Sequence, residues 1–257
     1  MKIYPLYEGS YSIDKNHVFK SFDPIVDLKA DRKGATFLDI NPFLLVTSTD
    51  VILLDTGLGQ RNEAGELKIF DNIRKVGYQP EDITIVLFSH LHKDHVGGLA
   101  TTVGDHFEMN FPNACHYISK KEWELVNSLQ KYTYRFKGFE MLENSEHIEF
   151  LTESMGMIND QITYETTGGH TDFHLVFHIK EGGEHVFFGG DILTMPEQVG
   201  SRLMSKNDKD PKKALEVRNV LVARAAAEKW LCVFYHGTHI KTGRIIENNG
   251  NFEVVEV

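Results

Sequence analysis

The segment SHLHKDHVGGL, residues 89–99, constrains this chain more than any other part of its sequence, because it gathers imidazole and carboxylate groups at the end of a predicted strand. The preceding run ITIVLFS (83–89) is continuously apolar and rich in β-branched residues, which is typical of a buried strand. The groups with lone pairs are His90, His92, Asp94 and His95. Gly97 and Gly98 remove side-chain bulk where the backbone passes close to its neighbours, and we expect a helix to start there.

The spacing of the motif indicates two points of convergence. Alternate residues of an extended segment point the same way, so the imidazoles of His90 and His92 can meet at one point. Asp94 and His95 come after the chain turns, and they can serve a second point a few ångströms away. Neutral imidazole and carboxylate are ligands that suit Zn²⁺ and its first-row neighbours. The motif therefore predicts part of a metal site.

Three later loops can complete such a site. His170 lies in TTGGHTDFH, Asp191 lies in FFGGDIL, and His236 follows the apolar run LCVFY. A catalytic two-metal site needs ligands for both ions at a separation of about 3.5–4 Å, and these residues could supply them. His239 in HGTH is a rival to His236, which we prefer because it directly follows the predicted strand.

Hairpins and helices recur along the whole chain, without a linker or a low-complexity tract. We predict hairpins over 43–55, 174–191 and 245–257, and helices over 67–77, 120–132 and 210–230. Both halves carry strands and helices, which predicts one domain, residues 1–257, with antiparallel-rich sheets and helices packed outside.

Two stretches have less definite patterns. The charged run KNDKDPKK (206–213) mixes signs and is interpreted as a solvated loop. An aromatic stretch beside the 120–132 helix either packs on the core or lines a substrate pocket; it contains Tyr132, Tyr134, Phe136 and Phe139.

The net charge of the chain restricts the classes of partner it can bind, and its two cysteines indicate the cellular compartment. A formal net charge of −10 argues against nucleic acid and anionic membranes as partners. Cys115 and Cys232 are isolated, which suits a reducing compartment. The N-terminal residues lack the apolar core of a signal peptide, and no apolar run approaches the ~20 residues of a membrane helix. We therefore expect a cytoplasmic protein that acts on a small molecule.

With these motifs in this order, the sequence resembles the metallo-β-lactamase superfamily over nearly its whole length. The matching positions are Asp55 in LLDTG, His90, His92, Asp94 and His95 in HxHxDH, His170 in GGHT, Asp191 in GGD, and His236. The resemblance implies an α/β (α+β) fold: a four-layer αβ/βα sandwich of two mixed, largely antiparallel sheets with outer helices. The site would lie at the edge of the sheets.

The resemblance also implies a role for each residue. One divalent ion would be held by His90, His92 and His170, and the other by Asp94, His95 and His236, with Asp191 bridging the two. Asp55 would hydrogen-bond the ligand loop, and His174 would support the site without binding metal. We expect two zinc ions, although manganese, iron and cobalt accept the same ligands.

Such a site is typical of a hydrolase of small ester-like substrates, namely lactones, carboxylic esters or phosphotriesters. A hydroxide bridging the ions would be the nucleophile, because coordination lowers the pKa of water to roughly 7. Asp94 is the candidate catalytic residue, placed to pass a proton to the leaving group. The candidate substrate-binding residues near predicted loops are Phe22, Met155, Met157, Phe173, Thr194 and Met195.

Within the superfamily, the C-terminal half is similar to the group of methyl parathion hydrolase and related lactonases. Those lactonases often carry a tyrosine three residues after the bridging aspartate, where this chain has Thr194. The absence of a cysteine in place of Asp191 argues against antibiotic hydrolysis. The resemblance also makes a homodimer through the N-terminal segment plausible.

Three alternatives keep the same fold. A mononuclear Fe(II) persulfide dioxygenase would use only one metal, whereas the intact Asp94, His95 and His236 favour two. An RNA-processing nuclease would need a basic surface or an appended arm, and neither is apparent. A binding module without catalysis would have no need of a complete ligand set.

Overall fold

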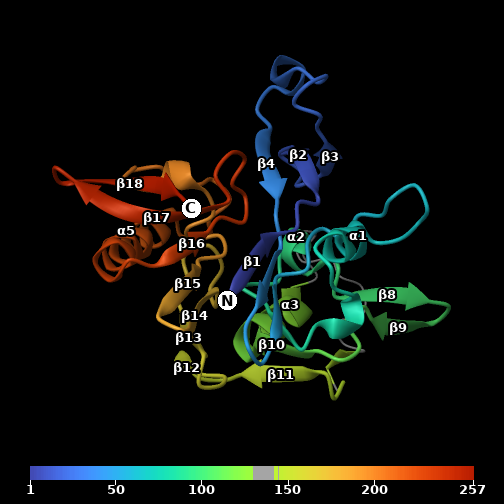
Figure 1. Cartoon of the computed structure of the whole chain (residues 1–257). Helices are drawn as coiled ribbons and strands as arrows, with labels where there is room; N and C mark the ends of the chain where they lie inside the picture. The colour runs from blue at the N-terminus through green and yellow to red at the C-terminus, as the bar shows by residue number, and fades with distance from the viewer. Residues whose placement is uncertain (130–141, 144) are drawn as a thin grey trace.

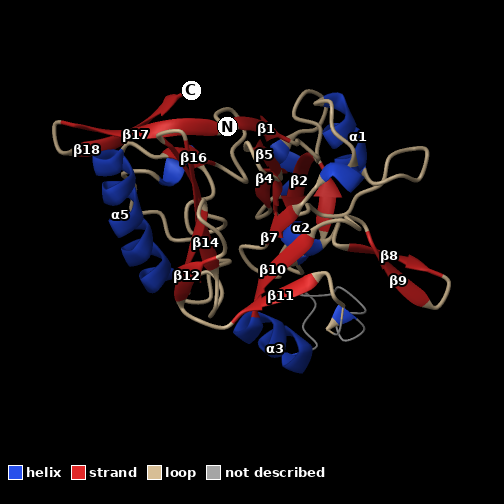
Figure 2. Cartoon of the chain, turned by 60° about the horizontal axis from the view of Figure 1, so that its bottom comes forward, coloured by secondary structure: helices blue, strands red, loops and turns tan. Residues whose placement is uncertain are grey.

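Two mixed β-sheets pack face to face, and helices cover the outer face of each sheet (Figures 1 and 2). This computed structural model describes residues 1–129, 142–143 and 145–257. The aromatic residues Tyr132, Tyr134, Phe136 and Phe139 lie outside the described residues. The arrangement confirms the α/β sandwich that the sequence predicts.

The first sheet has six strands in the order β1-β5-β6-β7-β10-β11. They are β1 (Lys2–Pro5), β5 (Phe43–Val46), β6 (Val51–Leu54), β7 (Ile85–Leu87), β10 (Cys115–Ser119) and β11 (Ile148–Leu151). The pairs β1–β5 and β5–β6 are antiparallel, but the pairs from β6 to β11 are parallel. This sheet is therefore less antiparallel than expected, because β6 to β11 are joined by crossovers that contain helices.

The second sheet has seven strands in sequence order. They are β12 (Met155–Met157), β13 (Ile162–Thr166), β14 (Leu175–Glu181), β15 (Glu184–Phe188), β16 (Leu231–Val233), β17 (Thr242–Asn248) and β18 (Asn251–Glu256). All neighbours are antiparallel except β15 and β16, which are connected through the long helix α5 (Pro211–Glu228). Asp210 caps α5, accepting the backbone N–H of Lys213 at 3.1 Å.

The alternation of side chains along the strands separates three apolar cores. In β5 and β6, Leu45 and Ile52 point between the sheets, whereas Leu44 and Leu53 point outward. The outward core is covered by α1 (Lys68–Lys75) and α3 (Lys120–Leu129), and α5 covers the second sheet (Figure 2). Because both faces of each sheet are covered, the central strands are continuously apolar.

Two smaller sheets were not expected from the sequence. One is a projecting N-terminal arm, which contains β2 (Gly9–Ile13), β3 (Phe19–Ser21) and β4 (Thr36–Ile40) (Figure 1). The other is the hairpin of β8 (Ala100–Val103) and β9 (His106–Met109). Short 3₁₀ turns lie at Lys29–Arg32, Pro80–Asp82 and Pro196–Gln198. Within the described part of the chain, no helix is long and apolar enough to cross a membrane.

One local prediction was wrong. The short helix α2 (Lys93–Val96) lies inside the histidine motif and ends at Gly97, so the two glycines follow the helix rather than begin it. The loop after β6 leaves no room for a side chain at either glycine. A Cβ on Gly97 would lie 2.3 Å from the carbonyl oxygen of Leu58, and one on Gly98 would lie 2.3 Å from that of Thr56. The two loops therefore pack backbone against backbone.

Candidate metal centre

The predicted ligands come from four loops that follow strands of both sheets. The loop after β7 carries the histidine motif, and the loops after β13, β15 and β16 carry His170, Asp191 and His236. His90, His95, His170 and His236 are each at most 5% exposed. Two sheets that pack face to face thus bring together side chains from both halves of the chain.

One group consists of His90, His92 and His170. Nδ1 of His92 lies 2.9 Å from Nε2 of His90 and 3.0 Å from Nε2 of His170. Three ring nitrogens therefore point at one small volume. A second group consists of Asp94, His95 and His236, with Nε2 of His236 3.5 Å from Oδ2 of Asp94.

Asp191 lies between these two groups. Its Oδ2 is 3.2 Å from Nε2 of His170, in the first group. Its Oδ1 is 3.3 Å from Nε2 of both His95 and His236, in the second group. Donor atoms that share a tetrahedral ion at 2.0–2.1 Å lie about 3.3 Å apart, so these separations suit a common ion. The buried Nε2 of His95 makes no hydrogen bond among the described residues, which leaves its lone pair for such an ion.

The opposite ring nitrogen of four histidines is held by an oxygen acceptor. Nδ1 of His95 lies 2.6 Å from Asp55 Oδ2, and Nδ1 of His236 lies 2.7 Å from the carbonyl oxygen of Asp39. His90 and His170 bind Ser89 Oγ at 3.0 Å and Asp208 Oδ1 at 2.8 Å in the same way. A proton on each Nδ1 leaves Nε2 as a lone pair directed into the site, which is the tautomer a metal needs.

The electrostatics of the site also favour a cation. Burial, followed by the neighbouring imidazoles, holds the pKa of His90 and His92 well below its usual value, so both are neutral. Burial acts in the same direction on His95, but the carboxylates of Asp191, Asp94 and Asp55 outweigh it and hold the pKa of His95 well above its usual value. A metal ion would supply the positive charge that these carboxylates otherwise draw from a proton.

Asp55 hydrogen-bonds the first ligand loop. It accepts the backbone N–H of Ser89 at 2.8 Å and the Ser89 hydroxyl at 2.7 Å, in addition to His95. Its φ of 54° lies in the left-handed region, which aspartate tolerates better than most residues. One fully buried carboxylate thus orients residues of both groups.

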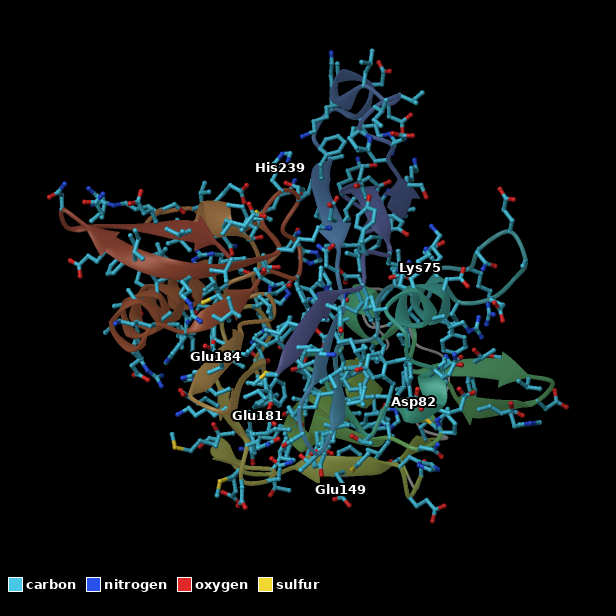
Figure 3. All side chains as sticks on the ribbon, in the orientation of Figure 1. Lys75, Asp82, Glu149, Glu181, Glu184 and His239 are labelled. Carbon is cyan, nitrogen blue, oxygen red and sulfur yellow. The ribbon has the colours of Figure 1, made fainter. Side chains whose placement is uncertain are left out.

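His174 and His239 both lie outside these groups. Nε2 of His174 accepts the backbone N–H of Asp191 at 3.0 Å, and its Nδ1 lies 3.0 Å from Thr167 Oγ1. Both ring nitrogens of His174 therefore have partners, so it supports the Asp191 loop. His239 is exposed (Figure 3), and His236 is the histidine that faces Asp94.

Several supporting residues were missed from the sequence. Asp208 lies in the charged run that was interpreted as solvated, yet it is 8% exposed and binds His170. The Tyr235 hydroxyl donates to the carbonyl oxygen of Asp94 at 2.7 Å, and its ring stacks on His95. Buried Glu122 accepts the Thr171 hydroxyl at 3.0 Å and also the backbone N–H groups of Leu91 and Phe173. None of these follows a recognisable motif, since each is defined by a tertiary contact.

The site opens into a cavity of about 480 Å³. Its floor includes His92, Asp94, His170, Asp191 and His236. Its apolar walls come from the N-terminal arm, from α3 and from the segment before α5, and they include Ile13, Phe19, Leu38, Leu125, Met195, Leu203 and Met204. Lys93, Lys206 and Lys209 also line it. The cavity can therefore hold a mostly apolar molecule with one polar group at the ligands.

The structure separates the six candidate substrate residues. Thr194 and Met195 line the cavity, and the Thr194 hydroxyl donates to Asp191 Oδ1 at 3.2 Å. The other four lie elsewhere: Phe22 packs on Phe37 beside a different cavity, Met155 and Met157 are exposed on the edge strand β12, and the ring of Phe173 lies 5.9 Å from Lys121 Nζ. Proximity to a predicted loop did not identify the residues of the cavity walls, because the N-terminal arm and segment 203–209 form much of these walls.

A four-layer sandwich with histidine and aspartate clusters at the ends of its strands is the architecture of a metal-dependent hydrolase. The chain belongs to the metallo-beta-lactamase superfamily, whose family model matches residues 35–225. That match includes all the predicted ligands except His236.

Solved structures of low sequence identity share this fold. A probable metal-dependent hydrolase from Staphylococcus aureus aligns with a TM-score of 0.79 and 19% identity, covering 100% of this chain and 96% of that one. AidC, described as a dizinc quorum-quenching lactonase, aligns with a TM-score of 0.74 and 21% identity, covering 99% and 94%.

Curated relatives match over shorter stretches. An N-acyl homoserine lactonase of Bacillus cereus is 29% identical over 150 residues, which is 51% of this chain and 53% of the relative. Another from a Bacillus species is 28% identical over 109 residues, covering 35% and 40%. The chain thus spans about half, or less, of the length of the curated relatives it matches.

Proposed function

We propose that the chain is a two-metal hydrolase of small ester-like substrates, that is, lactones, carboxylic esters or phosphotriesters. The observation that carries the proposal is the position of Asp191, with one carboxylate oxygen toward each ligand group. A single carboxylate placed in this way fits the role of a bridge between two ions. The dizinc lactonase that shares the fold supports zinc as the metal.

The positions of Asp94 and Thr194 indicate different roles for the two side chains. Two ions bound here would acidify a water to near neutral pH and polarise the oxygen of the scissile bond. Asp94 is 7% exposed and lines the cavity, so its carboxylate can take a proton and pass it to a leaving group. Thr194, by contrast, donates its hydroxyl to Asp191, and therefore acts on the bridging carboxylate rather than on the leaving group.

The apolar walls favour a substrate with an apolar arm. Leu203 and Met204 are 57% and 54% exposed, so they present apolar surface that a bound acyl or aryl group could cover. The lactonase relatives support lactones within the proposed range of substrates. Binding such an arm would also exclude water from the ligands.

The test combines metal content with hydrolysis. The chain is purified without added metal, its metals are counted by plasma mass spectrometry, and it is assayed on lactones, aryl esters and phosphotriesters. About two zinc-like ions per chain with chelator-sensitive turnover is the expected result. One iron per chain with oxygen uptake and no hydrolysis would overturn the proposal in favour of the mononuclear dioxygenase.

We also infer a single domain in the cytoplasm that forms a homodimer through its N-terminal arm, with no nucleic acid or membrane as partner. The dimer is supported by the arm's exposed apolar residues Ile25, Val26 and Leu28, which are 93%, 75% and 66% exposed. Apolar side chains gathered at one projecting tip are typical of an interaction surface. Light scattering of the purified chain tests this, and a monomer at micromolar concentration would count against it.

A further inference from the structure

The outer ring nitrogen of His170 is held by a carboxylate from another segment of the cavity wall. Its Nε2 faces His92 and Asp191, whereas Nδ1 lies 2.8 Å from Oδ1 of Asp208. Asp208 is 8% exposed and comes 38 residues later in the chain. The Nδ1–H of His170 therefore donates to a buried carboxylate.

Asp208 is held in place by its own surroundings. The backbone N–H of Lys209 donates to the carbonyl oxygen of His170 at 3.0 Å, and that of Asp210 donates to Gly169 at 2.8 Å. The segment after the cavity wall is thus tied to the His170 loop by two main-chain hydrogen bonds as well as by the carboxylate. A Cβ on Gly169 would lie 2.8 Å from the backbone of Ala214, at the start of α5, which shows how closely these segments pack.

A buried arginine holds the other end of this segment. Arg218 of α5 is 1% exposed, and its guanidinium donates to the carbonyl oxygen of Leu203. The segment 203–208 is therefore held to α5 near its start and to the His170 loop at its end.

We propose that Asp208 is a positioning residue that fixes the tautomer and orientation of His170. The proposal rests on the two-metal site of the proposed function. A carboxylate on Nδ1 keeps the proton there, directs the Nε2 lone pair into the first group and makes it more basic. Because residues 203–207 line the cavity next to Asp208, the same segment shapes the substrate wall and sets a ligand.

The experiment measures cobalt binding, with no substrate present. Metal-free wild type, Asp208→Asn and Asp208→Ala are titrated with Co²⁺ and followed by absorption of the bound ion. Asp172→Asn is the matched control, because Asp172 pairs with Lys209 in the same region and, among the described residues, makes no hydrogen bond or ion pair with the His170 ring.

We expect Asp208→Ala to weaken one of the two cobalt equivalents by about 10–100-fold, the usual effect of losing such a partner, and to leave the other unchanged. Asp208→Asn should fall between Ala and wild type, because an amide oxygen still accepts from Nδ1–H but carries no charge. Asp172→Asn should stay within about twofold of wild type.

The outcomes are separable. If Asp208→Ala and Asp208→Asn bind both equivalents like wild type, and only their melting temperatures fall, Asp208 is a packing residue and the proposal is wrong. A wild type that binds no cobalt would overturn the metal site itself and the proposal with it. If wild type and variants bind cobalt as expected but no ester is hydrolysed, the proposed function fails while the role of Asp208 stands.

Discussion

The carboxylate of Asp55 lies 2.6 Å from Nδ1 of His95, and both side chains are fully buried. Asp55 Oδ2 also accepts the hydroxyl of Ser89, whose oxygen faces Nδ1 of His90 at 3.0 Å. One carboxylate therefore sets the proton positions of one histidine in each ligand group. Its substitution should affect both predicted metal positions at once.

We predict that Asp55→Asn weakens metal binding by about 10–100-fold and lowers hydrolysis at least as much. Asparagine tolerates the left-handed backbone at this position, but its NH₂ group is only a donor. It cannot accept a hydrogen bond from any of the groups that donate to Asp55. Asp55→Ala should lose the same function and be less stable, because alanine also strains a φ of 54°. Metal titration and thermal melts of the two variants separate these effects; equal stability would argue against backbone strain.

Metal removal should lower stability markedly. Without ions, three carboxylates lie close to His95 with only protons to balance them. A ligand present at 1,000 times its Kd stabilises the native state by roughly 4 kcal/mol. Calorimetry before and after chelation should therefore show a clear fall in Tm that zinc restores and magnesium does not. An unchanged Tm would speak against a resident metal.

The contribution of Glu8 to the stability of the metal-free chain should fall as pH rises from about 4.5 to 7. Burial raises the pKa of Glu8 to about 7, even though the backbone N–H groups of Leu58 and Gln60 lower it. The folded state then holds a proton that the unfolded chain has released, so this contribution is complete below pH 4.5 and is lost by pH 7. The slope for one such group is about 1.4 kcal/mol per pH unit.

Glu8→Gln should remove part of this pH dependence. Urea unfolding at pH 5, 6 and 8 gives the free energy of unfolding of wild type and variant at each pH. The variant should become more stable relative to wild type as pH rises. Burial raises the pKa of Glu122 to about 7 as well, so the stability of the double variant with Glu122→Gln should differ from that of wild type by an amount that changes still more with pH. Parallel curves for wild type and Glu8→Gln would show that Glu8 ionises normally.

The contact between the two glycine loops can be tested with a matched pair. Gly59 and Gly65 have φ values of 72° and 83°, so alanine strains the backbone at either position by about 1–2 kcal/mol. At Gly65 the new Cβ meets nothing within 4 Å, whereas at Gly59 it lies 2.2 Å from the carbonyl oxygen of Gly97. Gly59→Ala should therefore cost more than Gly65→Ala in denaturant melts and should also loosen metal binding. Similar costs would mean that the loops can move apart.

The cavity wall should set substrate preference without setting stability. We predict that Leu203→Ser and Met204→Ser raise KM for esters with long acyl chains by roughly tenfold each and leave short esters unchanged, because only a long chain reaches this surface. Val220→Ser is the control, since Val220 is equally exposed but lies on α5 outside the cavity. A uniform loss on all esters would indicate that the wall supports the ligands rather than the substrate.

Motifs and periodicity predicted the elements of the sandwich and the residues that the structure gathers into two groups. His90 and His92 share a short spacing, and His170, Asp191 and His236 each come soon after a predicted strand, so strand ends were a sufficient signal. The N-terminal arm was missed because its strands are short and only partly buried. Partners such as Asp208 and Glu122 could not be predicted, since contacts between distant segments leave no local pattern.

The segment 203–208 both lines the cavity and supports a predicted metal ligand, so neither role can be changed without affecting the other. Its first residues form the substrate wall, and its last holds a histidine of the predicted metal centre. Inserting, deleting or exchanging residues there to admit a new substrate would shift Asp208 as well. New substrate ranges should therefore arise more readily by changes at arm residues that face the cavity away from Asp39, such as Ile13 and Phe19, because the Asp39 carbonyl oxygen holds His236. Large changes before α5 would lower the affinity for metal at the same time.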